Sequence, residues 1–115
     1  MIKMLHLYYD IMNLYGDYGN ISILKKHIED QGFEVTLDKK TLGEDIYFNE
    51  YDFIFIGSGT EKNLDVILND IRRYKAEIKE FIDKEKVILL TGNSFEIFRK
   101  IYRWKRSIRY IRFWS

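Results

Sequence analysis

Hydrophobic residues gather along this chain in short runs that are bounded by polar or glycine-containing turns. The runs are rich in β-branched and aromatic residues, which favours buried strands. The second run alternates between apolar and polar residues, as a half-buried strand does. The four predicted strands lie at residues 2–8, 33–37, 51–56 and 87–90.

Between these runs, apolar residues recur every three or four positions, which is the spacing of amphipathic helices. The three predicted helices lie at residues 18–31, 62–83 and 94–101. Gly32 provides a stop for the first helix. The helix at 62–83 is the longest, with Leu64 and Ile67 at the start of its apolar stripe. Residues 38–49 are predicted to form a polar connection.

The order of these elements predicts an α/β fold, with a layered, mostly parallel sheet and helices on both faces. In such sheets ligands gather at the carboxyl ends of the strands. Here those ends are followed by the loop at 9–20 and by the turns at 57–61 and 91–94. We find no GxGxxG or Walker A pattern, so a nucleotide site has no motif to support it.

Composition narrows the class of protein. The chain has 115 residues, 46% of them hydrophobic, which suits one small domain or a part of a larger one. Its apolar runs are shorter than the roughly 18 residues of a membrane span, and it begins without a signal-peptide pattern, so we expect a cytoplasmic location without membrane contact. The chain has no cysteine, which excludes disulfides, thiolate metal sites and cysteine nucleophiles.

Three segments together resemble a known family. They read YYDIMNLYGDYGN, FIFIGSGTEKN and TGNS, and the likeness extends over residues 4–102. The chain resembles the CobB/CobQ-type class I glutamine amidotransferases, and among them the glutaminase subunits of lipid II isoglutaminyl synthases. The resemblance implies a flavodoxin-like, class I amidotransferase-like fold, with residues 1–102 as the N-terminal half of the family domain.

The resemblance also implies a function. Members of the family hydrolyse glutamine and pass ammonia to a partner, here a Mur-ligase-like subunit that amidates the D-glutamate of lipid II. Related members act on cobalamin precursors. No metal or organic cofactor is expected for this half of the domain.

The turn after the third predicted strand matches the family's oxyanion and glutamine-binding loop. It contains Gly57, Ser58 and Gly59. Glycines let a backbone turn its N–H groups toward a ligand without obstruction by a Cβ atom. The structural alternative is an ordinary strand-to-helix turn in which Thr60 caps the following helix.

The family's nucleophile turn corresponds to residues 91–94. Matching the helix without a gap places Gly92 at the cysteine position, and matching the strand places Thr91 there. Gly92 is favoured because the elbow strains its backbone and glycine relaxes that strain. Asn93 is then a substrate-side residue, or with Glu96 the start of a capping box.

Catalysis by a hydroxyl of Thr91 or Ser94 would need a positioned base. The only histidines are His6, inside the first predicted strand, and His27, within the first predicted helix. We therefore expect an inactive chain. The alternatives are a non-catalytic docking domain for the Mur-ligase-like subunit and, less favoured, a nucleic-acid-binding protein.

Charge separates the last part of the chain from the rest. Seven of the 19 basic residues and none of the 18 acidic ones follow residue 98, so the first 98 residues carry −6 and the remainder +7. Residues 103–115 mix arginines with aromatic residues, which suits a nucleic-acid arm or a membrane anchor. A third hypothesis is a frameshift product, because synonymous codons for residues 104–115 yield in another frame a Leu-Gly stretch that resembles the family.

Overall fold

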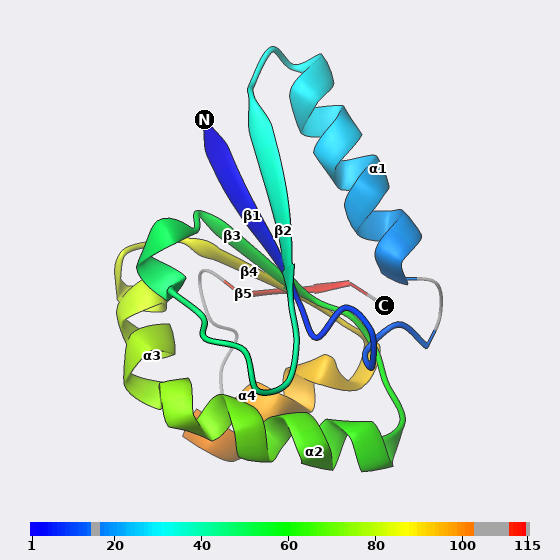
Figure 1. Cartoon of the computed structure of the whole chain (residues 1–115), viewed down its shortest axis with the longest axis vertical. Coiled ribbons are helices and arrows are strands. Elements are labelled where there is room, and N and C mark those ends of the chain that lie inside the picture. The colour runs from blue at the N-terminus through cyan, green and yellow to red at the C-terminus, as the bar shows by residue number, and fades with distance from the viewer. Residues whose placement is uncertain (15–16, 103–110, 115) are drawn as a thin grey trace.

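The computed structural model of the chain describes residues 1–14, 17–102 and 111–114. Its centre is a sheet of five strands in which all neighbours are parallel, in the order β2-β1-β3-β4-β5 (Figure 1). The strands are β1 (Ile2–Leu7), β2 (Val35–Lys40), β3 (Phe53–Ile56), β4 (Val87–Thr91) and β5 (Ile111–Trp114).

In the described residues, four helices and three short 3-10 turns connect the strands. The helices are α1 (Asp17–Asp30), α2 (Glu61–Ile71), α3 (Lys75–Asp83) and α4 (Phe95–Tyr102). The 3-10 turns are η1 (Phe48–Glu50), η2 (Arg72–Tyr74) and η3 (Gly92–Ser94).

Different helices cover the two faces of the sheet. On one face, Ile21 of α1 packs with Met4 and Phe55. On the other face, residues of α2, α3 and α4 form one large cluster with alternate residues of β1, β3 and β4. Figure 1 shows α1 apart from the other three helices, which lie together below the sheet. The predicted α/β fold, with a parallel sheet between helices, is therefore confirmed.

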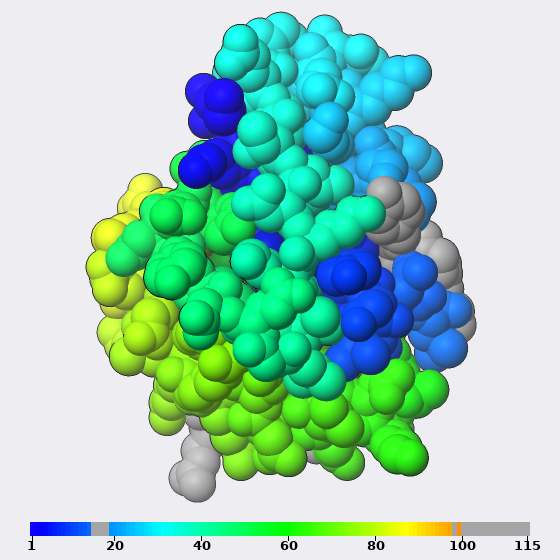
Figure 2. Space-filling view, in the orientation of Figure 1, coloured from blue at the N-terminus to red at the C-terminus, as the bar shows by residue number. Residues whose placement is uncertain are grey.

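The connection between β2 and β3 contributes to the core, which its polar sequence did not predict. Ile46 and Phe48 are buried in the cluster shared with α2 and α3. The ring of Phe48 meets that of Tyr74 edge-on, with 5.2 Å between centroids. In the space-filling view this connection, in teal, crosses the front of the molecule (Figure 2). It serves as a cover for one part of the sheet.

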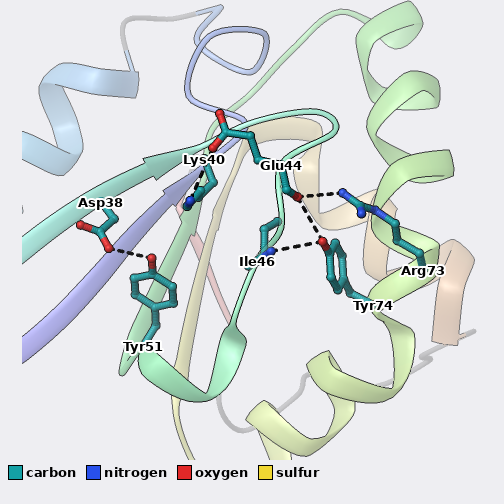
Figure 3. A network of polar contacts seen from close by, with 7 residues as sticks. All are labelled: Asp38, Lys40, Glu44, Ile46, Tyr51, Arg73 and Tyr74. Carbon is teal, nitrogen blue, oxygen red and sulfur yellow. Dashed lines mark hydrogen bonds and ion pairs between the residues drawn. The ribbon is translucent and has the colours of Figure 1, made fainter.

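The single long helix predicted at 62–83 is wrong, because η2 separates α2 from α3. At this point two side chains turn toward the connection (Figure 3). Arg73 Nη2 and the Tyr74 hydroxyl donate to the carbonyl of Glu44 at 2.9 and 3.1 Å, and the amide of Ile46 donates to the Tyr74 oxygen at 3.2 Å. The apolar stripe continues through the break, so periodicity alone could not reveal it.

The second strand was predicted at residues 33–37 but is found at Val35–Lys40 (β2). Its position is set by pairing with β1, from Ile2 beside Val35 to Leu7 beside Lys40. The polar end of this edge strand is held by Asp38, which accepts a hydrogen bond from the Tyr51 hydroxyl at 2.7 Å (Figure 3). Burial, together with this carboxylate, raises the pKa of Tyr51.

A fifth strand was not predicted. Residues 111–114 form β5, which pairs in parallel with β4 from Ile88–Ile111 to Thr91–Trp114. Arg112 interrupts the apolar pattern in this short segment, so it did not read as a strand. The rest of the basic tail, residues 103–110 and 115, lies outside the described residues. The frameshift hypothesis for residues 104–115 stays a prediction that the nucleotide sequence tests.

Candidate functional site

Three turns meet where β1, β3 and β4 end. The strands are in register, with Leu7 beside Ile56 and Ile56 beside Leu90, so they end at the same edge of the sheet. The segment at 8–14 follows β1, the turn at 57–60 follows β3, and η3 follows β4. The sequence predicted these three segments as the ligand-side edge, and the structure brings the described parts of them together.

Two buried serines join the second turn to the third. The hydroxyls of Ser58 and Ser94 both donate to the carbonyl of Thr91, at 3.0 and 2.8 Å. The Ser94 hydroxyl also lies 3.2 Å from the carbonyl of Ile56. Because both hydroxyls donate to carbonyl oxygens, they hold the turns together in this arrangement and are not poised beside a base.

Asn93 makes a second link between the same turns. Its Oδ1 accepts from the amide of Gly59 at 3.1 Å, and its Nδ2 donates to the carbonyl of Gly59 at 2.6 Å. Both polar atoms of the side chain therefore bond to one residue of the neighbouring turn. The predicted capping box is therefore wrong. Asn93 bonds across to the neighbouring turn, and Glu96 instead accepts a hydrogen bond from Arg99 at 3.0 Å.

At Gly59 and Gly92, residues of a neighbouring turn approach the backbone so closely that only glycine fits. A Cβ atom at Gly59 would collide with the sulfur of Met12 and come within 3.2 Å of the Ile11 carbonyl. Gly92 has φ +58°, in the left-handed region, and a Cβ atom there would collide with the side chain of Ser58. A larger residue at Gly59 requires Met12 to shift, and one at Gly92 requires Ser58 to shift.

The segment at 8–14 is tied to the second turn from the other side. The amide of Leu14 donates to the carbonyl of Ser58 at 3.0 Å. Asn63 Nδ2, in the first turn of α2, donates to the carbonyl of Ile11 at 3.1 Å. The predicted N-cap is confirmed, because the hydroxyl of Thr60 accepts from the amide of Asn63 at 3.1 Å.

Tyr8 anchors this segment from within the core, and sequence reasoning missed it. Its φ is +58°, which is uncommon for a residue with a side chain. The buried hydroxyl donates to Asp70 of α2 at 2.6 Å, and Asp70 also pairs with Arg73 at 3.3 Å. Burial, reinforced by the hydrogen bond to Asp70, raises the pKa of Tyr8 well above its usual range. A tyrosine at a strand end carries no signal for this role.

Neither histidine belongs to these turns. His6 lies buried in β1, with its ring against Phe55 at 5.0 Å between centroids. His27 is exposed in the last turn of α1, roughly 15 Å along the helix axis from its first residue. Across residues 1–14, 17–102 and 111–114, no group of three or more potential ligands could hold a metal ion.

The predicted site residues thus fall into one cluster. Gly57, Ser58 and Gly59 are buried, and Ser58 and Gly59 contact the turn that contains Thr91, Gly92 and Asn93. The hydroxyls of the cluster and the side-chain amide of Asn93 bond to backbone groups of the neighbouring turns. The cluster offers no thiol, because the chain contains no cysteine.

Sequence comparison finds curated relatives of this chain. It is 35% identical over 101 residues to subunit GatD of the glutamine-hydrolysing lipid II isoglutaminyl synthase of Streptococcus pneumoniae (strain ATCC BAA-255 / R6), covering 88% of this chain and 39% of that protein. The GatD subunit of Staphylococcus aureus (strain N315) is 28% identical over 97 residues, covering 84% and 40%. The chain spans about two fifths of the length of these relatives. No protein-family model matches it.

A solved structure shares the fold. The structure of PurLQS from Thermotoga maritima superposes with a TM-score of 0.61, over 90% of this chain and 46% of that chain. Sequence identity is 15%, so this likeness concerns the fold alone.

Proposed function

Since this chain is a homologue of the GatD subunits of lipid II isoglutaminyl synthase, we propose that it is a glutamine amidotransferase-like subunit that does not itself hydrolyse glutamine. In this proposal residues 1–102 correspond to the N-terminal half of the family domain. The chain docks onto a Mur-ligase-like subunit that amidates lipid II. We favour lipid II over cobalamin precursors because both named relatives act in lipid II isoglutaminyl synthase.

The observation that carries this proposal is a set of joined turns without the groups that cleave an amide. Glutamine hydrolysis needs a nucleophile and a base within hydrogen-bond reach. The chain has no cysteine, His6 is buried in β1 and His27 lies on α1. The described part of the chain also contains no helix that is long and apolar enough to cross a membrane. We propose a cytoplasmic location for the protein.

We assign Gly92 to the nucleophile position, with Thr91 as the alternative in the other register. Support comes from the positive φ of Gly92, which suits a strained elbow, and from Ser58, which fills the space where a side chain would begin. Gly57, Ser58, Gly59 and Asn93 are then what remains of the glutamine-side turns.

The experiment is a glutaminase assay that measures ammonia release, together with size-exclusion chromatography on a mixture with the ligase-like subunit of the pneumococcal enzyme. We expect no ammonia release by this chain alone and co-elution with the partner. Hydrolysis of glutamine by the isolated chain would contradict the proposal, and so would the lack of a complex.

Gly92→Cys is the matched control variant for the assay. It returns a thiol to the assigned position, yet it should also release no ammonia, because Ser58 obstructs the site and no histidine joins the turn. Hydrolysis by this single variant would show that only the sulfur had been missing.

A further inference from the structure

A groove lies between the connection that leads from β2 to β3 and the segment formed by η2 and the start of α3. Its volume is about 610 Å³. Its buried lining residues, Ile46 and Phe48, are apolar, and the ring of Tyr74 lies beside Ile46, whose amide donates to the Tyr74 oxygen (Figure 3). Tyr47 lines the same groove and is 62% exposed. The groove therefore offers apolar and aromatic contact area to a ligand.

Three exposed carboxylates line this groove, those of Asp45 and Glu50 from the connection and that of Glu77 from α3. No lysine or arginine lies among its described lining residues. Within the described part of the chain, none of the three carboxylates takes part in an ion pair. Their negative charge is therefore available to a cation that enters the groove.

Three cations on the adjoining elements have other partners. Arg73 donates to the carbonyl of Glu44 at 2.9 Å. Lys84 and Lys86 donate to the side-chain oxygen and the carbonyl of Asn49, each at 3.3 Å. These cations bond to neutral oxygens, and in the ranges that the structure describes none of them pairs with a carboxylate of the groove. The unpaired charge in the groove is therefore negative.

An arginine side chain matches both features of the groove. Its guanidinium is planar, weakly hydrated and always charged, so it can stack on an aromatic ring while its N–H groups donate to carboxylates. The chain shows such a stack on the same wall, because the guanidinium of Arg73 lies 4.4 Å from the ring centroid of Tyr74. Tyr47 offers a second ring to a guanidinium that comes from outside, since most of its surface is exposed. Charge complementarity thus points to a basic occupant.

We propose that this groove is a docking site for an amphipathic segment of a partner protein, which presents an arginine between apolar residues. The arginine stacks on Tyr47 and pairs with the carboxylates of the groove, and its apolar neighbours contact the lining beside Phe48. The groove shares no residue with the three joined turns. The inference therefore goes beyond the proposed function, and it depends neither on ammonia release nor on the ligase-like subunit.

The test titrates the full chain with the peptide acetyl-Ala-Leu-Arg-Leu-Ala-amide and follows the amide resonances of Tyr47 and Glu77 in nitrogen-15 NMR spectra. We expect a saturable shift of both resonances at about 0.15 M salt. The same peptide with citrulline in place of arginine keeps the shape and loses the charge. It should bind about tenfold more weakly, as expected for the loss of two exposed ion pairs. The absence of a saturable shift, or equal binding of the two peptides, would overturn the proposal.

The double variant Asp45→Asn/Glu77→Gln removes two carboxylates of the groove and keeps the size of both side chains. It should bind the arginine peptide about tenfold more weakly than the unchanged chain. Asp30→Asn/Glu34→Gln is the matched control, because it removes the same charge from exposed residues outside the groove. It should bind within about twofold of the unchanged chain. An equal loss in both double variants would contradict the proposal, since the peptide would then respond to net charge alone.

Tyr47→Ala tests the aromatic part of the groove and should weaken binding about threefold, because the guanidinium loses an exposed ring. Unchanged binding by this variant would place the peptide elsewhere and overturn the proposal. Sedimentation velocity distinguishes a partner protein from a second copy of this chain. Self-association that the Asp45→Asn/Glu77→Gln variant abolishes would assign the groove to a second copy, against the proposal.

Discussion

The two faces of the sheet are covered to different degrees. On the face of α2, α3 and α4, nineteen buried residues of the described part of the chain form a continuous cluster. On the face of α1, the described residues give a cluster with three fully buried members, Met4, Ile21 and Phe55, surrounded by residues that are only partly buried. Among the described helices, α1 lies on this face, while α2, α3 and α4 lie on the other (Figure 1).

This difference indicates where the stability of the described chain resides. Burial of apolar surface provides most of the favourable free energy of folding. Residues that alternate along β4 face opposite ways, so Leu90 belongs to the large cluster and Leu89 to the edge of the small one. Neighbours in one strand therefore offer a direct comparison of the two faces.

The largest expected effect separates these neighbours. Leu90→Ala should reduce the free energy of unfolding by about 3 kcal/mol, because a fully buried leucine leaves a cavity. Leu89→Ala should cost about 1 kcal/mol, since its surroundings are partly open to water. Urea denaturation of both variants measures the difference. Equal losses would mean that the two faces are filled alike.

A smaller effect is expected from the buried hydroxyl on the large cluster. Tyr8→Phe removes the hydrogen bond to Asp70 and should cost about 1–2 kcal/mol, because the partly buried carboxylate of Asp70 loses a donor. Thermal unfolding monitored by circular dichroism measures the loss. Tyr47→Phe is the control, because Tyr47 is exposed, and it should leave the transition unchanged.

The raised pKa of Tyr8 leads us to expect that the stability of the fold depends on pH in the alkaline range. Burial and the bond to Asp70 raise the pKa of Tyr8 above its ordinary value of about 10. Below that pH both states hold the proton and stability is unaffected. Above it the unfolded chain releases the proton while the folded chain keeps it, so the free energy of unfolding falls by about 1.4 kcal/mol per pH unit. Tyr8→Phe should show a shallower fall.

The smallest effect is expected from surface ion pairs, and it should be the same on both faces of the sheet. Lys25 and Glu29 of α1 pair at 3.1 Å, and Lys79 and Asp83 of α3 pair at 2.9 Å, all on the surface. Double-mutant cycles to alanine should give about 0.3–0.5 kcal/mol for each pair. A clearly stronger pair on one helix would mean that charge, and not only apolar burial, distinguishes the faces.

Much of the fold could be predicted because its signals are local. The runs that became β1, β3 and β4 are mainly apolar, and the stripe of α2 and α3 is regular. The break at η2 was hidden because it depends on Arg73 and Tyr74 reaching the carbonyl of Glu44, far away in sequence. The strand β5 was hidden because it depends on pairing with β4, while its own short apolar pattern is interrupted by Arg112.

The candidate site was predictable in its location but not in its contacts. Parallel strands end at one edge, so the turns at 57–60 and 91–94 had to be neighbours. The bonds of Asn93 to Gly59 depend on the distance between those turns, which sequence does not give. The anchor formed by Tyr8 and Asp70 joins residues 62 positions apart and has no local motif.

The charged end of β2 has a consequence for self-association. This strand lies at one edge of the sheet, where exposed backbone groups could recruit a strand from another molecule. Asp38, Lys39 and Lys40 follow one another at that edge, and a docking strand would have to strip water from them. Consecutive charged residues on an edge strand act as gatekeepers against amyloid-like growth.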